Sequence, residues 1–310
     1  MGKLAFIFPG QGSQYVGMGS DLYQGNSAFR DVMQEADARL GFPLSRICFD
    51  GPEDQLTLTT NTQPAILAHS VGVWSIVASE GITPDVVAGH SLGEYSALVA
   101  AGGISLSDAV YAVRRRGEMM QEAVPVGEGT MAAVLGLDAS VVNEICYLAA
   151  EGEIVELANL NCPGQIVIAG NVSAVGRALV LAKKKGAKRA IQINVSAPFH
   201  SSLMKHARDG MVDVLGEIRF SDLKFPLINN ADVEEISAGD AAREGLIKQI
   251  VSPVRWEETI LRMKKMGVDT FVELGPGKVL CGLVKRIVKR VKCLNAEDGE
   301  SLQNTLAELR

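Results

Sequence analysis

The sequence predicts an α/β protein with a parallel-sheet, hydrolase-like core and an inserted ferredoxin-like subdomain. Two short apolar runs, at residues 4–8 and 86–88, each end in a glycine-containing turn that precedes helical sequence. Such bounded runs are typical of strands buried on both faces of a parallel sheet. Between residues 127 and 196 the rhythm changes, because strands and helices alternate there over shorter distances. We therefore expect a large core that is interrupted by a smaller subdomain.

The first part of the core, residues 1–126, is expected to hold two strands and several helices. After the strand at residues 4–8, helices are predicted at 27–40 and in the segment that follows Thr62-Gln63-Pro64. Pro64 suits the first turn of a helix, because an N–H has no partner there to lose. The strand at residues 86–88 and a pair of helices follow, before a stretch rich in Pro and Gly.

The insert is predicted over residues 127–196. Its elements run strand, helix, strand, strand, helix, strand, at residues 131–137, 139–150, 154–160, 165–169, 172–185 and 188–195. This βαββαβ order is that of a ferredoxin-like unit.

The second part of the core is predicted over residues 197–310. Its expected elements are a helix from about residue 199, a strand at 225–229, helices near 241–250 and 256–266, a strand at 270–274 and a helix at 278–288. Ligands of open α/β sheets bind outside the carboxyl ends of the strands. We therefore expect the active site at that edge, in the cleft between core and insert.

Composition limits the class of protein. The chain has 310 residues, a net charge of −6 and an isoelectric point near 5.4, which argues against nucleic acid as a partner. The five cysteines form no metal-ligand pattern, so we expect reduced, packed thiols and no metal. The first apolar run is too short for a signal peptide, and His69, His90 and Glu94 interrupt the most apolar windows. We expect a cytoplasmic enzyme without a membrane partner.

One motif carries a chemical mechanism. Residues 89–93 read Gly-His-Ser-Leu-Gly, between a predicted strand and a predicted helix. In this context G-x-S-x-G forms a sharp turn that exposes the serine hydroxyl, so Ser91 is a candidate nucleophile. A second interpretation remains open at this point: Ser91 and Glu94 fit S-x-x-E, a capping box in which the serine only caps its helix.

A nucleophilic serine needs a base, and the chain has four histidines. His69 lies in an apolar helix, where a packed ring is expected, and His206 lies on a helix, where a solvated ring is expected. His90 is adjacent to Ser91, so its ring should point away from the hydroxyl. His200 follows the last strand of the insert, at the rim of the expected cleft, and is the favoured base.

A developing oxyanion needs two amide donors. The amide of Leu92, which follows the nucleophile, is one candidate. The amide of Gln11, in the loop after the first strand, is the other. Arg114, Arg115 and Arg116 lie near the end of a neighbouring helix. They form either a solvated basic face or a group in which one guanidinium binds a substrate carboxylate.

Ordered motifs over about residues 4–290 resemble one family. They are residues 8–14 (FPGQGSQ), 62–65 (TQPA), 89–98 (GHSLGEYSAL), 116–117 (RG) with 120–121 (MQ), 161–165 (NCPGQ), 198–200 (PFH) and 272–277 (VELGPG). Together they resemble the malonyl-CoA:acyl carrier protein transacylases, of the stand-alone bacterial type that serves fatty-acid synthesis.

The resemblance implies roles for individual residues. Ser91 would carry the malonyl group and His200 would be its base. Gln11 and Leu92 would supply the oxyanion amides. Arg116 would bind the malonyl carboxylate, and Gln249 would orient the histidine. In the family no acidic residue completes the pair.

The resemblance also implies substrates and partners. Malonyl-CoA would acylate Ser91, and the phosphopantetheine thiol of acyl carrier protein would accept the group in a ping-pong cycle; no cofactor would be bound. Phe199 resembles the pattern of malonyl-selective domains, although methylmalonyl-CoA and a simple packing role remain open. We expect a monomer, since no coiled-coil pattern is present.

The acidic carrier protein requires a local basic patch on this acidic chain. Two patches are candidates, and a solvated helix face is the alternative for each: Lys183, Lys184, Lys185, Lys188 and Arg189 on the insert, and Lys285, Arg286, Lys289 and Arg290 near the C-terminus. A serine hydrolase or thioesterase using the same Ser–His pair is the competing function. A non-catalytic carrier-binding module is disfavoured, because every site residue is present.

Overall fold

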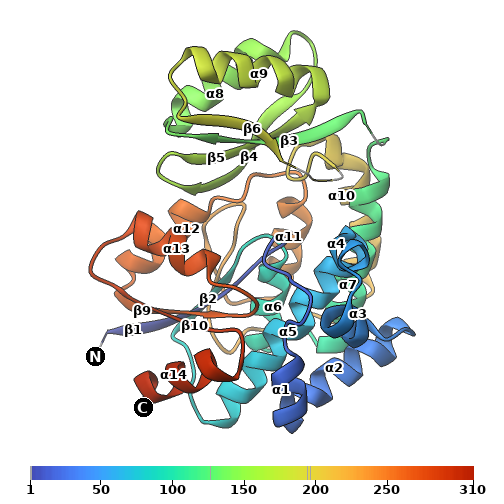
Figure 1. The fold of residues 1–310 in the computed structure, drawn as a ribbon, viewed down its shortest axis with the longest axis vertical. Helices are drawn as coiled ribbons and strands as arrows, with labels where there is room; N and C mark the ends of the chain where they lie inside the picture. Colours follow the sequence, from blue (N-terminus) through green and yellow to red (C-terminus); the bar gives the residue numbers. More distant parts are fainter. Residues whose placement is uncertain (1, 126, 194, 196) are drawn as a thin grey trace.

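The computed structural model describes residues 2–125, 127–193, 195 and 197–310, and the strands of this part of the chain form two sheets (Figure 1). The larger sheet has the order β10-β9-β1-β2-β7-β8. Its strands are β1 (Lys3–Phe8), β2 (Val86–Gly89), β7 (Leu227–Ile228), β8 (Glu235–Ile236), β9 (Val268–Leu274) and β10 (Lys292–Ala296).

The larger sheet is mixed. β1 pairs in parallel with β2 and with β9, β10 pairs in parallel with β9, and β2 pairs in parallel with β7. β8 runs antiparallel to β7 at one edge. The prediction of a wholly parallel sheet is therefore wrong at this edge, because a two-residue strand leaves no periodic pattern in the sequence.

The central strand β1 is buried on both faces, as predicted. Phe6 and Phe8 point into one core, which contains residues of α2, α5, α6 and α7. Ala5 and Ile7 point into a second core, which contains residues of α12 and α13. Successive side chains of a strand alternate between its faces, so an unbroken apolar run is required where both faces are covered.

The helices of the larger body surround this sheet. They are α1 (Ser20–Gly25), α2 (Ser27–Leu40), α3 (Leu44–Asp50), α4 (Glu53–Thr57), α5 (Thr59–Ser79), α6 (Gly93–Ala100), α7 (Leu106–Glu122), α10 (Lys205–Gly216), α11 (Gly239–Gln249), α12 (Trp256–Lys265), α13 (Val279–Ile287) and α14 (Gly299–Leu309). None of the helices in the described chain is long and apolar enough to span a membrane.

Pro64 differs from its expected position. α5 begins at Thr59, so Pro64 lies inside the helix rather than in its first turn. Proline has no N–H, which frees the carbonyl oxygen of Thr60 one turn earlier. The Arg114 side chain donates a hydrogen bond to this oxygen at 3.2 Å. A side chain from α7 thus compensates for the missing backbone hydrogen bond.

The smaller sheet lies above the larger body and has the order β4-β5-β3-β6 (Figure 1). Its elements follow one another as β3 (Gly129–Leu135), α8 (Ala139–Ala150), β4 (Val155–Cys162), β5 (Gln165–Asn171), α9 (Val172–Lys184) and β6 (Arg189–Ile193). All of its strand pairs are antiparallel. The proposed boundary residues 126 and 196 lie outside the described residues.

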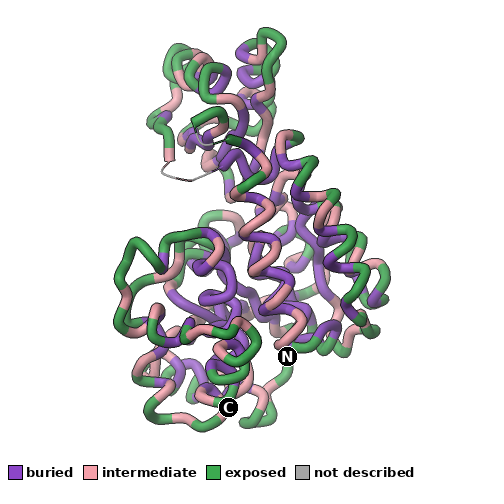
Figure 2. Tube along the Cα trace, turned by 90° about the vertical axis from the view of Figure 1, so that its right-hand side faces the viewer, coloured by how far each residue is buried: buried purple, intermediate pink, exposed green. Residues whose placement is uncertain are grey.

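The smaller body has a core of its own. Ala132, Val134 and Ile168 pack with residues of α8 and α9 on one face of the sheet. Met131 and Val167, on the other face, belong to the core of the larger body. Figure 2 shows this division as two buried interiors with exposed outer turns. The smaller sheet therefore covers the larger body with one face.

Candidate active site

Ser91 lies on a sharp turn between β2 and α6, in a left-handed backbone conformation with φ 52°. The two glycines of the motif make this turn possible. A Cβ on Gly89 would lie 1.8 Å from the carbonyl carbon of Gly93, and a Cβ on Gly93 would lie 2.1 Å from the carbonyl oxygen of Phe8. Only glycine allows such close approach of backbone to backbone. The turn is the one predicted for a nucleophile.

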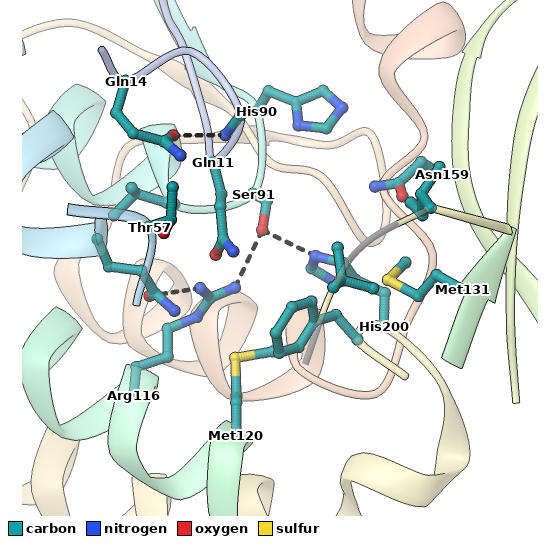
Figure 3. Close-up of a pocket in the computed structure, with 16 residues that line it drawn as sticks. Gln11, Gln14, Thr57, His90, Ser91, Arg116, Met120, Met131, Asn159 and His200 are labelled. Carbon is teal, nitrogen blue, oxygen red and sulfur yellow. Dashed lines mark hydrogen bonds between the residues drawn. The ribbon is translucent and has the colours of Figure 1, made fainter. Parts of the chain in front are cut away.

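Parallel pairing places the predicted loops at one edge of the sheet. Phe8 of β1 is in register with Gly89 of β2. The loops that follow carry Gln11 and Ser91, and both residues line one pocket of about 380 Å³. The smaller sheet contributes Met131, Asn159 and other lining residues (Figure 3). The site therefore lies between the two sheets, as predicted.

Ser91 and His200 form a hydrogen-bonded pair, with Ser91 Oγ 2.7 Å from His200 Nε2 (Figure 3). The other ring nitrogen, Nδ1, lies 3.0 Å from the carbonyl oxygen of Gln249. A carbonyl only accepts, so Nδ1 carries the proton and Nε2 is free to accept the serine proton. Burial, together with the positive charge of Arg116, lowers the pKa of His200 to about 3. The imidazole is therefore neutral, and its Nε2 can accept a proton.

The capping-box interpretation is wrong. A capping box requires the Glu94 side chain to accept the Ser91 backbone N–H. Instead Asn230 Oδ1 accepts it, at 2.7 Å. The Ser91 hydroxyl contacts His200 and Arg116 and does not cap α6. The Ser91 hydroxyl is therefore not used to cap the helix.

Arg116 is buried, at 2% exposure, beside Ser91. Its Nη2 donates to Ser91 Oγ at 3.1 Å and to Gln249 Oε1 at 3.0 Å, and its Nη1 donates to Gln63 Oε1 at 2.7 Å. These partners are all neutral, and burial lowers the pKa of the guanidinium. A buried cation with neutral partners favours the binding of an anion.

The neighbouring arginines lie elsewhere. Arg114 pairs with Glu118 at 2.7 Å, and Arg115 contacts the same carboxylate. Both are partly exposed, and Arg114 also donates to Thr60 and Asn61 of α5. The sequence left three candidates for binding a carboxylate, and only Arg116 lines the pocket.

The two predicted oxyanion donors both line the pocket. Within the described chain, the backbone amides of Gln11 and Leu92 donate to no other group. The Gln11 side chain donates to Thr59 Oγ1 at 3.2 Å. Leu92 stands at the N-terminus of α6, where unpaired amides attract negative charge. Both amides are therefore available to a reacting carbonyl oxygen.

Gln249 is fully buried and acts through two groups. Its backbone oxygen contacts His200. Its side chain accepts from Arg116 and donates to the backbone oxygen of Ser91 and to Glu94, each at 3.0 Å. The contact with the histidine is thus made by the backbone, while the carboxamide fixes Arg116 and the serine turn.

The remaining predicted residues have distinct places. Phe199, at 8% exposure, lines the pocket and also belongs to the core. The His90 ring points away from Ser91, and its Nε2 lies 2.9 Å from Asn161 Oδ1 (Figure 3). His69 is buried against the Phe29 ring, and burial lowers its pKa to about 4. His206 is exposed.

The sequence analysis missed Gln63, Glu94 and Asn230 as site residues. Gln63 and Glu94 lie inside motifs that were recognised for other reasons. Asn230 is the second residue after β7, and a polar residue close to the end of a strand was the only signal available for it. No group of three or more His, Cys, Asp or Glu residues in the described chain is placed to hold a metal ion.

Comparisons with known proteins show the family of this chain. The family model described as "Acyl transferase domain" matches residues 5–303. The malonyl CoA-acyl carrier protein transacylase of Bacillus subtilis is 50% identical, over 100% of this chain and 98% of its own length. A crystal structure of an acyl carrier protein S-malonyltransferase from Vibrio cholerae is 46% identical with a TM-score of 0.96, covering 98% of this chain and 99% of that one.

A further structural relative is a malonyl-transacylase solved in complex with a type II PKS acyl-carrier protein. It is 44% identical with a TM-score of 0.97, and the match covers 99% of both chains. The chain therefore belongs to the acyl transferase family and is an acyltransferase. Within that family it belongs with the malonyl CoA-acyl carrier protein transacylases.

Proposed function

We propose that this enzyme moves the malonyl group of malonyl-CoA to the phosphopantetheine thiol of acyl carrier protein, through an ester on Ser91. The observation that carries the proposal is the buried Arg116 guanidinium, which lies 3.1 Å from Ser91 Oγ and whose hydrogen-bond partners among the described residues are all neutral. A malonyl group ends in a carboxylate, which matches this cation. An acetyl group leaves it unpaired, and a buried unpaired charge costs about 3–5 kcal/mol.

The first half-reaction acylates the enzyme. His200 Nε2 takes the proton of the Ser91 hydroxyl, and Oγ attacks the thioester carbonyl carbon. The amides of Gln11 and Leu92 stabilise the oxyanion that forms. The carbon–sulfur bond then breaks, and the CoA sulfur leaves with the proton from His200. The malonyl ester remains on Ser91, with its free carboxylate on Arg116.

The second half-reaction uses the same atoms in reverse. His200 takes the proton of the phosphopantetheine thiol, whose sulfur attacks the ester carbonyl. The bond to Ser91 Oγ breaks, and the serine regains the proton. One site serves both thiols in turn, so the kinetics are ping-pong. Phe199 narrows the pocket beside the acyl group and favours malonyl over branched units.

The same proposal covers the domain division. Residues 1–126 and 197–310 form a hydrolase-like core, supported by the serine turn that follows a parallel strand. Residues 127–196 form a ferredoxin-like insert, supported by the βαββαβ order and by β5 and β3 as the inner strands. We further propose a monomer in the cytoplasm that uses no bound cofactor.

The carrier protein docks beside the pocket, on Lys285, Arg286, Lys289 and Arg290. Each of these side chains is exposed. Arg286 contacts the Gln165 side chain and donates to the Pro163 oxygen at 3.3 Å. Gln165 lines a second hollow that shares Gln11 and His90 with the main pocket. This continuity favours the C-terminal patch over the lysines of α9.

Intact-protein mass spectrometry tests the function. Wild type and Ser91→Ala are incubated briefly with malonyl-CoA, and pantetheinylated carrier protein is then added. A malonyl adduct on wild type alone, discharged by the carrier, supports transfer through Ser91. Rapid release of free malonate without an adduct or carrier transfer makes the protein a hydrolase instead.

A further inference from the structure

A buried asparagine holds the turn that carries the nucleophile. Asn230, fully buried, lies in the loop after β7. Its Oδ1 accepts the backbone N–H of Ser91 at 2.7 Å, and its Nδ2 donates to the backbone oxygen of Gly89 at 2.7 Å. One side chain therefore bridges the two sides of the turn.

A buried glutamate fixes this asparagine in turn. Glu94, at 1% exposure, lies in the first turn of α6, directly after the motif. Its Oε2 accepts from the backbone N–H of Asn230 at 2.9 Å and from Gln249 Nε2 at 3.0 Å. Gln249 holds Arg116 and the carbonyl side of Ser91. Glu94 thus links Asn230, which holds the Ser91 turn, to Gln249, which holds the Arg116 guanidinium.

We propose that Asn230 is a positioning residue, which keeps Ser91 in its left-handed conformation and directs Oγ at His200, and that Glu94 sets the position of Asn230. The proposal rests on the proposed function only in taking Ser91 as the nucleophile. No part of Asn230 touches Oγ in the described contacts, so it acts through the backbone.

The backbone at Ser91 needs such support. A serine with φ 52° occupies a sparsely populated region, which persists only where the surroundings fix it. The Ser91 N–H and the Gly89 carbonyl are two backbone groups of the turn that find their partner in the Asn230 side chain. Without Asn230 both groups lose that partner, and Oγ samples positions outside hydrogen-bond reach of His200. A displacement of about 1 Å from the reactive geometry lowers a rate about 100-fold.

The test compares two neighbouring asparagines. Asn230→Ala removes both contacts with the turn. Asn229→Ala is the matched control, because Asn229 is also buried but its side chain accepts from Glu234 and reaches Asp232 in its own loop. Each full-length variant is measured for its melting temperature, its KM for malonyl-CoA and its single-turnover rate of Ser91 malonylation. The reaction of Ser91 with phenylmethylsulfonyl fluoride is followed in parallel.

The expected result is a loss in rate with little change in binding. Asn230→Ala should acylate about 100-fold more slowly with both reagents, with KM within about threefold of the wild type. Asn229→Ala should keep the wild-type acylation rate even if its melting temperature falls as much as that of Asn230→Ala. Equal rates in the two variants overturn the proposal.

Two further readouts keep the test decisive. Asn230→Asp keeps the acceptor for Ser91 and loses the donor to Gly89, so its rate should fall between wild type and Asn230→Ala, about tenfold down. If Asn230→Ala does not fold, a wild-type rate in Asn230→Asp overturns the proposal. The sulfonyl fluoride needs neither malonate nor CoA. A wild type that reacts with it but not with malonyl-CoA disproves the proposed function and leaves the role of Asn230 measurable.

Discussion

The Arg116 guanidinium lies 3.1 Å from the Ser91 hydroxyl oxygen, and within the described residues its other hydrogen bonds reach only the neutral side chains of Gln63 and Gln249. The cation is therefore placed before the substrate arrives. An acyl group on Ser91 that ends in a carboxylate supplies the missing charge. In the proposed function, the residue that selects the substrate is therefore hydrogen-bonded to the nucleophile.

The selectivity prediction follows from this contact. Arg116→Ala should lower kcat/KM for malonyl-CoA by about 100-fold or more and should leave that for acetyl-CoA nearly unchanged, because only malonyl loses a charge partner. Both constants are measured with each thioester. Arg114→Ala is the control, since Arg114 pairs with Glu118 outside the pocket. An unchanged ratio of the two constants in Arg116→Ala contradicts the role.

The pH profile of acylation should show no loss near pH 6.5. Burial and then the charge of Arg116 lower the pKa of His200 to about 3, so the base stays neutral from pH 8 down to pH 5 and loses function only when it is protonated below that. Arg116→Met removes the positive charge and should move the acidic limb to higher pH. Phenylmethylsulfonyl fluoride is the reagent, because its reaction does not depend on the malonyl carboxylate.

Glu94 is the control for this profile. Burial raises the pKa of its carboxyl to about 7. A change in the acylation rate near neutral pH can therefore come from Glu94 as well as from a histidine. A step that disappears in Glu94→Gln belongs to Glu94. A decline near pH 6.5 that persists in that variant shows a histidine with an ordinary pKa and contradicts the prediction.

The glycine prediction contrasts two Gly→Ala changes. Gly93→Ala places a Cβ 2.1 Å from the carbonyl oxygen of Phe8 in the central strand, so the turn or the sheet must shift. We expect a loss of about 3 kcal/mol or more in unfolding free energy and no Ser91 acylation. Gly176→Ala, in α9 with nothing within 4 Å of the new Cβ, should stabilise by about 0.5–1 kcal/mol. Denaturant unfolding measures both, and a Gly93→Ala enzyme as stable as wild type refutes the steric argument.

The docking prediction concerns charge reversal. Replacing Lys285, Arg286, Lys289 and Arg290 by Glu should raise KM for the carrier protein about tenfold or more at low salt and leave KM for malonyl-CoA within about threefold. The matched variant reverses Lys183, Lys184, Lys185 and Lys188 on the insert. If the insert variant shows the larger effect, the carrier docks on the smaller sheet instead.

Regular elements with strong local patterns were predictable. The helices at 27–40 and 139–150 have the predicted bounds, because their apolar spacing and flanking residues are local signals. β8 and the last strand and helix, β10 and α14, were not predicted. β8 has two residues, and β10, which reads Lys-Cys-Leu-Asn-Ala at a sheet edge, has neither an unbroken apolar run nor a regular alternation of polar and apolar residues. Such strands depend on their neighbours more than on their own sequence.

The residues of the site were likewise predictable only where a local motif marks them. Ser91 and its glycines carry a compact motif, and the pairing with His200 followed from the small number of histidines. Asn230 contacts Ser91 from 139 positions away, and no motif links the two. The choice of Arg116 among three adjacent arginines required the family resemblance at first and the pocket afterwards. Local sequence patterns thus could not predict the contacts between segments that are far apart in the chain.

The backbones of Ser91 and His200 are both left-handed, with φ 52° at Ser91 and 60° at His200. Neither is a conformation that a short peptide holds by itself. The reactive pair therefore exists only after segments far apart in the chain have docked. Serine reactivity is accordingly a chemical reporter of completed folding: during refolding it should emerge after the helical signal, and a chain with native helices but an undocked β7 loop should remain inert.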